Sequence, residues 1–372
     1  MIKFKRTDDT VEMKKIGRTI VEESPEKYSS ATLNLIRDTI EQFYPSEDPS
    51  TKETMLYVSV YDYWSHGSLI NEWCYLSFWG KTTEEKIAFV PAHEKLLYIY
   101  HLNRRSDAYQ LDDKYEAFTR LKKYYHRDVI VLHNSDDFDV FSSFVDKHSS
   151  FIVKPTDSGY SKGVFRQDLQ DLSEETKKQV FNDILKGGEQ FNSGKTSRSG
   201  SLVIEEVLNQ ADEMAIIHPN SVNVVRVTTI RIADKVHIFY PWLKVGVHGE
   251  AITGGINSSI LAGINPDTGV VDTLGITNCL DKYEYHPLTN IKIPGFQIPM
   301  WDELKTLSVD LAMQFPSIGY IGWDFALSPS GWCVIEGNVS GQLLGQLLYG
   351  KGIKSELEAL LNWKPDKDFW WE

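Results

Sequence analysis

Apolar residues in the N-terminal part of the chain recur with the spacing of amphipathic helices. One stripe repeats at intervals of three and four residues and consists of Leu33, Ile36, Ile40 and Phe43. Such spacing places these side chains on one face of a helix. Ser24 followed by Pro25 is typical of a helix start, and Pro45 is expected to end the same helix. The pattern predicts a helical region from the start of the chain to about Asn103.

The stretch from residue 57 to residue 79 is rich in aromatic side chains, namely Tyr61, Tyr63, Trp64, Trp73, Tyr75, Phe78 and Trp79. Two interpretations are open: a platform on which sugars or bases stack, or the core of a helical region. Large aromatic side chains are mostly buried in folded proteins, which favours the core.

Beyond Asp113 the pattern changes to short strands that alternate with helical stretches. Runs rich in β-branched or aromatic residues occupy residues 129–132, 151–154, 202–205, 224–232, 236–242 and 332–336. Helical stretches lie at residues 114–125 and 301–315. The alternation predicts an α+β or α/β fold. Residues 186–201, which contain many Gly and Ser residues, are the best candidate for a linker or mobile loop.

Near the C-terminus, apolar runs at residues 321–327 and 332–336 flank the sequence Ser-Pro-Ser-Gly, so they predict a β-hairpin. Glu336 and Asn338 are two residues apart and therefore point the same way, and Asp324 on the partner strand can meet them. Two carboxylates and an amide oxygen suit a hard cation such as Mg²⁺, although hairpin carboxylates also commonly face solvent. The apolar surroundings favour the metal site, because burying unpaired carboxylates is costly.

An apolar strand leads directly into Lys154 and Pro155, and a loop of small residues follows, with Ser158, Gly159, Ser161 and Gly163. Backbone N–H groups of such a loop can cradle phosphate oxygens while Lys154 and Lys162 supply positive charge. The loop matches neither common glycine-rich nucleotide motif, so an ordinary surface turn remains the alternative. Lys114, which begins a predicted helix, is by itself an ordinary solvated lysine.

Composition narrows the classes of function. The chain has 372 residues, enough for two or three packed units at about 150 residues per domain. Its formal net charge of -13 argues against binding along a nucleic-acid backbone, which needs a basic face. The 3 cysteines, far apart in sequence, are typical of reduced thiols in the cytoplasm. No stretch approaches the roughly 20 apolar residues that span a bilayer, so we expect a soluble, cytoplasmic protein without membrane insertion.

Five short motifs follow one another in order: DK at residues 113–114, FIVKP at 151–155, the glycine loop, VIEEVL at 203–208, and WD with IEGN in the C-terminal hairpin. This order resembles the ATP-grasp superfamily. HPNSVNVVRVTTI at residues 218–230 is similar to a strand of its sugar-transfer-associated group, found with polysaccharide biosynthesis, and of the related TupA-like proteins. The resemblance covers about residues 111–350.

The resemblance implies an α+β fold in which two subdomains clasp ATP, preceded by a helical region rich in aromatic residues. It divides the chain into a helical N-terminal region at residues 1–110, a first ATP-grasp subdomain with a phosphate-lid loop at 111–201, and a second subdomain with the adenine hinge and the metal site at 202–372. It also implies ATP and Mg²⁺ as cofactors.

The resemblance further implies roles for single residues at the ATP site. Lys114 and Lys154 would contact the α- and β-phosphates. A mobile lid over these phosphates would include Thr156, Ser158, Gly159, Ser161, Lys162 and Gly163. The adenine hinge would consist of Glu205, Glu206, Val207 and Leu208. Either Asp212 or Glu213 would hold the ribose hydroxyls.

The metal ligands implied by the resemblance are Asp324, Glu336 and Asn338. The catalytic cations that it implies are Lys154, Arg226 and Lys244. The substrate would be bound by Ser221, Asn223, Arg226, Ser340 and Gly341. Two positions depart from the family pattern: Lys244 stands where relatives commonly have arginine, and Asn257-Ser258-Ser259 replaces an asparagine followed by paired glycines. Lysine lacks the two-pronged guanidinium, so these departures concern the acceptor site more than the ATP site.

The resulting hypothesis is an ATP- and Mg²⁺-dependent carboxylate–amine ligase that acts through an acyl phosphate, in polysaccharide, capsule or glycoconjugate biosynthesis. Its substrates would be small molecules, a carboxylate and an amine, such as an amino acid and a sugar or nucleotide sugar. Glycan-assembly proteins are candidate partners, and nucleic acid is not. The alternatives are a kinase that phosphorylates a sugar or another hydroxyl, and a non-catalytic nucleotide-binding scaffold. The intact set of Asp324, Glu336 and Asn338 argues against the scaffold.

Overall fold

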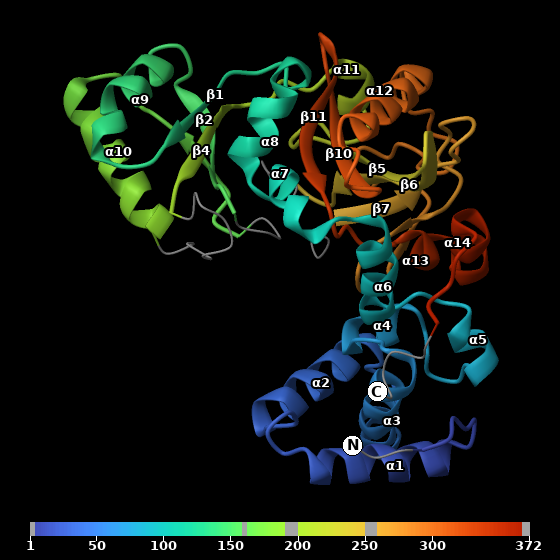
Figure 1. Ribbon diagram of the computed structural model, residues 1–372. Helices are drawn as coiled ribbons and strands as arrows, with labels where there is room; N and C mark the ends of the chain where they lie inside the picture. Colours follow the sequence, from blue (N-terminus) through green and yellow to red (C-terminus); the bar gives the residue numbers. More distant parts are fainter. Residues whose placement is uncertain (1–3, 158–161, 190–199, 250–258, 367–372) are drawn as a thin grey trace. The chain divides into compact units, whose positions relative to one another are not determined.

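The computed structural model describes residues 4–157, 162–189, 200–249 and 259–366 (Figure 1). Contacts between its residues divide the chain into a helical unit and a mixed unit. The helical unit consists of Met1–His101, Ile276–Lys282 and Gln342–Glu372. The mixed unit consists of Leu102–Gly275 and Tyr283–Gly341. No helix in the described ranges combines the length and the apolar character needed to cross a membrane.

The predicted helical region is confirmed. Its helices are α1 (Thr10–Glu23), α2 (Ser30–Phe43), α3 (Pro49–His66), α4 (Ile70–Tyr75), α5 (Thr83–Ile87) and α6 (Ala92–Leu102), and the C-terminal part adds α13 (Gly345–Tyr349) and α14 (Lys354–Leu361). The predicted start of the second helix was wrong, because Ser24 is the C-cap of α1. The N-cap of α2 is Ser29, whose side chain accepts a hydrogen bond from the backbone of Thr32.

Aromatic side chains form the core of the helical unit, as predicted. Tyr61, Trp73 and Phe78 are fully buried. A buried polar group lies among them: Asp62 accepts hydrogen bonds from Trp73 Nε1 at 2.7 Å and from Lys86 Nζ at 2.9 and 3.0 Å. Because these rings are buried, they support the interpretation as a helical core rather than the one as a stacking platform.

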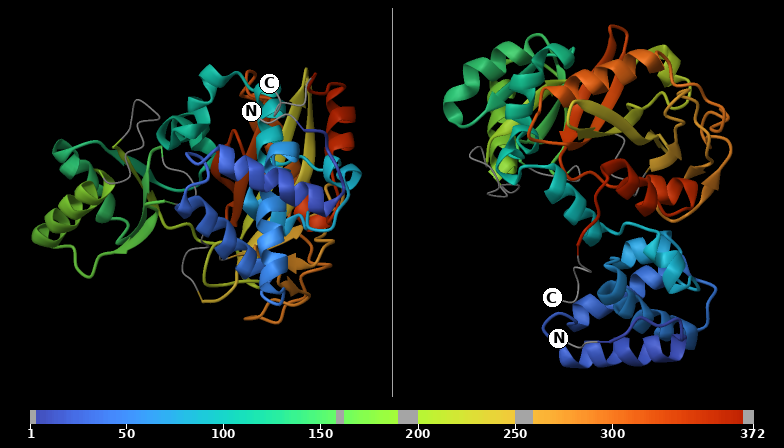
Figure 2. Two further views of the ribbon diagram at one scale, coloured as in Figure 1. Left: turned by 90° about the horizontal axis from the view of Figure 1, so that it is seen from below. Right: turned by 45° about the vertical axis from the view of Figure 1, so that its right-hand side comes forward.

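The mixed unit contains a smaller and a larger sheet. Among the described residues, the smaller sheet has four strands in the order β1-β4-β2-β3. They are β1 (Val129–Leu132), β2 (Ser150–Pro155), β3 (Phe165–Asp168) and β4 (Leu202–Glu206). Helices α9 (Phe138–Val145) and α10 (Glu174–Glu189) pack on one face of this sheet (Figures 1 and 2). Their side chains share a core with Phe151 and Val153 of β2.

The larger sheet has seven strands within the described ranges, in the order β11-β10-β5-β6-β7-β8-β9. They are β5 (Val224–Ile232), β6 (Lys235–Gly246), β7 (Ser259–Gly263), β8 (Gly275–Ile276), β9 (Lys282–Tyr283), β10 (Tyr320–Ser328) and β11 (Gly331–Asn338). The nearby helices are α7 (Tyr109–Asp112), α8 (Lys114–Leu121), α11 (Asp212–Ala215) and α12 (Trp301–Met313). The mixed composition of helix and sheet agrees with the predicted α+β class.

Most predicted strands occur within a few residues of their expected bounds, and the C-terminal hairpin is confirmed. The helix expected at residues 114–125 ends earlier, because α8 passes into a 3-10 helix at Lys122–Tyr124. The expected linker at residues 186–201 was partly wrong, because α10 continues to Glu189. Residues 190–199 of that segment lie outside the described residues. Strands β3, β7, β8 and β9 were not predicted.

Candidate functional site

The larger sheet has a core face and a polar face. Val225 and Val227 of β5 pack in the core of the mixed unit, and α12 packs against β5 and β6. Side chains alternate along a strand, so Arg226 lies on the opposite face. We call this opposite face the polar face, and its members used below are Arg226, Trp242, Lys244, Asp324, Glu336 and Asn338.

Charged residues of three neighbouring strands form a row on the polar face. Arg226 of β5 pairs in register with Asp324 of β10, which in turn pairs with Glu336 of β11. The guanidinium of Arg226 binds both carboxylate oxygens of Asp324, with Nη2 2.7 Å from Oδ2. Asn338 Nδ2 donates to Glu336 Oε1 at 3.1 Å. The structure therefore brings together all three predicted metal ligands and the predicted catalytic arginine.

A β-bulge sets the direction of the acidic residues. Asp324 is paired with Glu336, but Phe325 is paired with Val334, so β11 has one extra residue at this point. Val334 is fully buried in the core, whereas Glu336, two residues on, contacts Asn338 on the polar face. Without the bulge, the alternation would place Val334 and Glu336 on the same face.

The positive charges on the polar face favour the ionised form of Asp324. Burial opposes ionisation, but Arg226 and Lys244 outweigh it and hold the pKa of Asp324 below its ordinary value. The pKa of Lys244 is itself lowered by burial, which the nearby Asp324 only partly offsets. Arg226 also lies over the ring of Trp242, 5.2 Å from its centre. Cations and carboxylates thus stabilise one another across the polar face.

Small residues leave room for the Arg226 side chain. A Cβ atom at Gly322 or at Gly341 would come within 3.2 or 3.1 Å of Arg226 Nη1. Tyr320, on β10, donates a hydrogen bond from its hydroxyl to the Gly341 carbonyl at 2.8 Å. Of the two C-terminal residues predicted to bind substrate, Gly341 therefore lies beside Arg226, and Ser340 is exposed next to it.

On the smaller sheet, Lys154 and Arg127 meet Glu205, and we call these three residues the Glu205 cluster. Lys154 Nζ and Arg127 Nε both donate to Glu205 Oε2, at 2.8 and 2.9 Å. Burial alone would raise the pKa of Glu205, but the two cations bring it down to about 2. The carboxylate is therefore ionised and engaged, and its side chain lies beside the predicted phosphate lysine.

Lys114 lies close to both the Glu205 cluster and the charged residues of the polar face. Its helix α8 begins at the N-cap Asp113, whose side chain accepts from the backbone of Tyr115 and Glu116. The Lys114 backbone N–H donates to the Thr156 carbonyl at 2.9 Å, which ties α8 to the end of β2. Burial lowers the pKa of Lys114, and the charges of Glu336 and Glu205 oppose this shift. Its ammonium therefore interacts with carboxylates of both sheets.

The predicted adenine hinge lies at the end of β4. Glu206, the last residue of β4, donates its backbone N–H to the Asp128 carbonyl at 2.9 Å, and its carboxylate accepts from the Asp128 backbone at 3.0 Å. Val207 and Leu208 follow and are partly exposed. The side chain of Asp128 is itself bound by His148, whose Nε2 lies 2.9 Å from Asp128 Oδ2. These bonds tie the first part of the predicted hinge to the residue just before β1.

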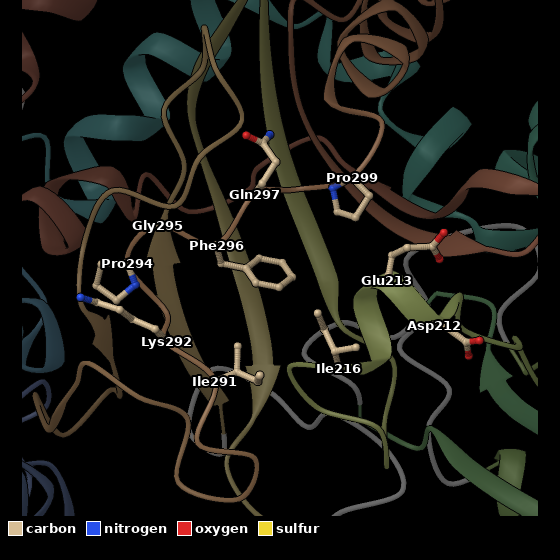
Figure 3. A pocket seen from close by; sticks show the side chains of 10 residues that line it. All are labelled: Asp212, Glu213, Ile216, Ile291, Lys292, Pro294, Gly295, Phe296, Gln297 and Pro299. Carbon is tan, nitrogen blue, oxygen red and sulfur yellow. The ribbon is translucent and has the colours of Figure 1, made fainter.

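The predicted ribose residues, Asp212 and Glu213, lie on α11. Asp212 and Glu213 are exposed and line a pocket of about 870 Å³, together with Ile216 and the loop residues Ile291, Lys292, Pro294, Gly295, Phe296, Gln297 and Pro299 (Figure 3). None of the predicted phosphate or metal residues lines this pocket. Its walls belong to α11 and to a loop that packs against the core face of the larger sheet. The pocket is thus separate from the polar face.

The predicted substrate residues before β5 are held by a buried network. Ser221 Oγ lies 3.0 Å from His218 Nδ1, and the His218 ring packs on Gly246 of β6. Asn223 uses its side-chain N–H groups on the carbonyls of Met214 and His218, at 2.7 and 3.0 Å. This use of Asn223 anchors the entry into β5, the strand that carries Arg226.

Several predicted residues of the lid lie outside the described residues, namely Ser158, Gly159 and Ser161. The same holds for Asn257 and Ser258, whereas Ser259 begins β7 and is buried. Thr156 and Asp157 are buried at the end of β2. Lys162 is exposed, and Gly163 has a φ of 73°, a conformation that favours glycine.

Four residues of the site were not predicted from the sequence, namely Arg127, Trp242, Tyr320 and His218. Arg127 stands at the end of a helical stretch and before a strand, where an arginine is ordinarily solvent-exposed. Its contacts with Glu205 and Val334 span 78 and 207 residues, so no local pattern indicates them. Trp242 was visible as a period-two neighbour of Lys244, and this spacing would have placed it on the same face.

Comparison with known families identifies the class of protein. The family model of sugar-transfer associated ATP-grasp proteins matches residues 94–362. The chain belongs to this family, as its motifs indicated. The match also extends beyond the region of about residues 111–350 where the motifs lie.

Solved structures of ATP-grasp enzymes are similar to this chain at low identity, and no curated protein matches it. D-alanine–D-alanine ligase from Helicobacter pylori is 17% identical, with 76% of this chain and 69% of that chain covered and a TM-score of 0.44. The ATP-grasp ligase PsnB, complexed with a minimal precursor, is 13% identical over 73% of this chain and 70% of its own, with a TM-score of 0.41. The biotin carboxylase domain of 2-oxoglutarate carboxylase from Hydrogenobacter thermophilus is 11% identical, and the chain spans 52% of its length, with a TM-score of 0.44.

Proposed function

We propose that this protein is an ATP- and Mg²⁺-dependent ligase that joins a carboxylate to an amine through an acyl phosphate. Family membership supports ATP as the energy source. The observation that carries the proposal is the row of Arg226, Asp324 and Glu336 across three strands, with Lys244 beside it. Such a surface offers oxygen ligands for a cation next to positive charges for phosphate and carboxylate oxygens.

The proposed metal ligands have the right chemistry for Mg²⁺. Asp324, Glu336 and Asn338 offer only oxygen atoms, which hard cations prefer. Arg226 occupies one position on each Asp324 oxygen, but each carboxylate oxygen has two lone pairs and can accept again. Asn338 uses its N–H groups on Glu336 and on the Gly322 carbonyl, which leaves the amide oxygen as the ligand atom. When bound, Mg²⁺ would offset the charge of the phosphates.

The cations would act at separate points of the reaction. Lys154 and Lys114 would bind phosphate oxygens of ATP, since Lys154 lies near the end of β2 and the charge of Lys114 interacts with both Lys154 and Glu336 of the acidic row. Arg226 and Lys244 would hold the substrate carboxylate and the transferred phosphoryl group. Attack of the carboxylate on the γ-phosphorus would give an acyl phosphate and ADP. The amine nitrogen would then attack the acyl carbon, and inorganic phosphate would leave as the amide forms.

Arg226 has the more demanding role in this scheme. It already forms a two-pronged bond to Asp324, so its position is fixed before substrate arrives. Positioned charge stabilises the oxyanion of the tetrahedral intermediate without reorganisation at the moment of reaction. Lys244 brings a compact point charge, which binds a carboxylate without the two-pronged geometry of a guanidinium.

The family description associates these proteins with sugar transfer, and we therefore propose a sugar acid, an amino sugar or a nucleotide sugar as one substrate, with an amino acid as the other. Glycan-assembly proteins are the proposed partners. This substrate class is consistent with a polar face that combines charges with a tryptophan ring, because sugars stack on aromatic rings while their acidic groups bind cations.

The test is incubation of the protein with Mg-ATP and a panel of amino acids, uronic acids, amino sugars and nucleotide sugars, followed by mass spectrometry. Ligation yields a product whose mass is the sum of two substrates less one water, together with ADP and phosphate. A product heavier than one substrate by a phosphoryl group would instead indicate a kinase. Parallel reactions with hydroxylamine trap an acyl phosphate as a hydroxamate. ADP release without any hydroxamate or amide, across the whole panel, would contradict the ligase.

A further inference from the structure

The Glu205 cluster contains two cations and one carboxylate. Arg127 Nε and Lys154 Nζ share a single oxygen, Glu205 Oε2. The side chains of Arg127 and Glu205 are 3% and 5% exposed, whereas that of Lys154 is 14% exposed. Lys154 is therefore the member that a ligand reaches, and Arg127 is the member that stays enclosed.

Arg127 is fixed by groups from different elements. Its Nη1 donates to the carbonyls of Tyr125 at 2.9 Å and Val334 at 2.8 Å. The guanidinium lies 4.4 Å from the centre of the Tyr125 ring. Val334 belongs to β11, two residues before Glu336, so Arg127 connects the smaller sheet with the strand that carries the acidic row. An arginine held at these points cannot follow Lys154 toward a ligand.

We propose that Arg127 is a positioning residue of the ATP site, which neutralises Glu205 and thereby leaves the ammonium of Lys154 as surplus positive charge for phosphate. The inference rests on the proposed role of Lys154 as a phosphate ligand. Without Arg127, Lys154 and Glu205 form a neutral buried pair. A phosphate would then have to break this pair before it gained the lysine.

The electrostatics of Glu205 show that both cations act on it. Burial works against the ionised carboxylate, and the charges and hydrogen bonds of Arg127 and Lys154 together overcome it and lower the pKa of Glu205. Arginine suits this role because its guanidinium stays charged and binds several acceptors at once. Glu205 Oε2, Tyr125 O and Val334 O are three acceptors in fixed positions.

The experiment is a double-mutant cycle measured by calorimetric binding of Mg-ATP. The parent, Arg127→Met, Glu205→Gln and the double variant are compared. We expect Arg127→Met to weaken Mg-ATP binding at least tenfold when Glu205 is present, because Lys154 is then captured. In the Glu205→Gln background the same change should alter the dissociation constant less than threefold, since no carboxylate is left to capture the lysine. A purely structural role of Arg127 predicts equal losses in both backgrounds.

Two control variants separate the effect of the Arg127 charge on Mg-ATP binding from a general loss of stability. Lys86→Met breaks the buried pair with Asp62 in the helical unit and should lower the melting temperature without changing the dissociation constant of Mg-ATP. Arg127→Lys keeps a charge near Glu205 and should bind Mg-ATP within threefold of the parent. It also serves as the decisive variant if Arg127→Met does not fold, because a tenfold loss in Arg127→Lys would overturn the role assigned to charge.

The outcomes distinguish this inference from the proposed function. If the parent does not bind Mg-ATP, the proposed function is wrong, and the role of Arg127 falls with it. If the parent binds but Arg127→Met binds equally well, or the double variant binds as weakly as Arg127→Met, only the inference about Arg127 is overturned. Restored binding in the double variant supports it.

Discussion

Two buried ion clusters in this protein differ in their balance of charge. In the helical unit, Asp62 meets one lysine, Lys86, and the indole N–H of Trp73. In the mixed unit, Glu205 meets two cations, Arg127 and Lys154. The Asp62 cluster is neutral and closed, whereas the Glu205 cluster carries an extra positive charge next to the surface.

The pKa values of the two carboxylates are shifted in opposite directions overall. Burial raises the pKa of Asp62, and a single lysine with one indole donor does not reverse the shift. Burial acts in the same direction on Glu205, but two cations bring its pKa down to about 2. If Lys154 binds phosphate as proposed, a surplus cation rather than burial of charge as such distinguishes the Glu205 cluster from one that only stabilises the fold.

The largest expected effect concerns the acidic row. Asp324→Asn and Glu336→Gln remove charge from the proposed metal site with little change in volume. We expect each to lower turnover of ATP at least a hundredfold, on the order of 2.7 kcal/mol of activation free energy. Turnover measured over a series of Mg²⁺ concentrations is the appropriate assay, because a weakened metal site shifts the concentration at which activity appears.

The Asp62→Asn variant, which changes the buried cluster of the helical unit, serves as the control for this prediction. It leaves Lys86 without a carboxylate in the core of the helical unit and should destabilise the protein by about 3 kcal/mol or more. Turnover of the remaining folded protein should match that of the parent. Normal activity of both acidic-row variants at limiting Mg²⁺ would remove the basis for the metal assignment.

A smaller effect is expected for the surplus cation itself. Lys154→Met keeps much of the packing of the side chain and removes its charge. It should weaken ATP binding or lower turnover at least tenfold, on the order of 1.4 kcal/mol. The melting temperature without ligand should stay near that of the parent, because Arg127 still compensates Glu205.

Thermal shifts with Mg-ATP provide the check. A ligand that binds only the native state raises stability in step with its affinity, so the parent should gain more than Lys154→Met at equal nucleotide concentration. The matched change Lys86→Met should lower the melting temperature yet leave the shift caused by ATP intact. Equal shifts and equal turnover in the parent and in Lys154→Met would refute the assignment of Lys154 to phosphate.

Local patterns were sufficient to predict much of the fold. Alternation and turn residues indicated the C-terminal hairpin, and β1 and β5 occur with the predicted bounds. They also put Glu336 and Asn338 together. The bulge opposite Asp324 was not predictable, because an unbroken alternation from Val334 would send Glu336 into the core. The predicted helix start at Ser24 was wrong because Ser followed by Pro is also compatible with a helix end followed by a turn.

Contacts between residues far apart in the sequence limit how much of the candidate site could be predicted. The pairing of Arg226 with Asp324 joins residues 98 apart, and that of Arg127 with Val334 joins residues 207 apart. The family resemblance assigned Arg226 and Asp324 to the active site but did not predict that they pair, and nothing in the sequence near Arg127 indicates its contact with Val334. Asp212 and Glu213, which the family resemblance assigned to the ribose, lie on the wall of a surface pocket, and their role stays a prediction.

The smallest expected effect is on acid stability, where the two clusters should differ in sign. The pKa of Glu205 in the folded protein, about 2, lies below its ordinary value of 4.5. This group therefore adds stability above pH 4.5 that is lost as the pH falls toward 2. Asp62 has a raised pKa, so its contribution is fully present below its ordinary value of 3.8 and is lost as the pH rises.

Denaturant unfolding at pH 6, 5 and 4 tests this contrast through the slope of stability against pH, since each substitution also shifts stability as a whole. From pH 6 to pH 4 the parent should lose about 1 kcal/mol more than Glu205→Gln, because the variant lacks the carboxylate whose ionised form the folded state favours. Asp62→Asn should change the slope in the opposite direction. The same slope in all three proteins would mean that neither carboxylate titrates differently in the folded and unfolded states, and the charge comparison between the two clusters would lose its physical basis.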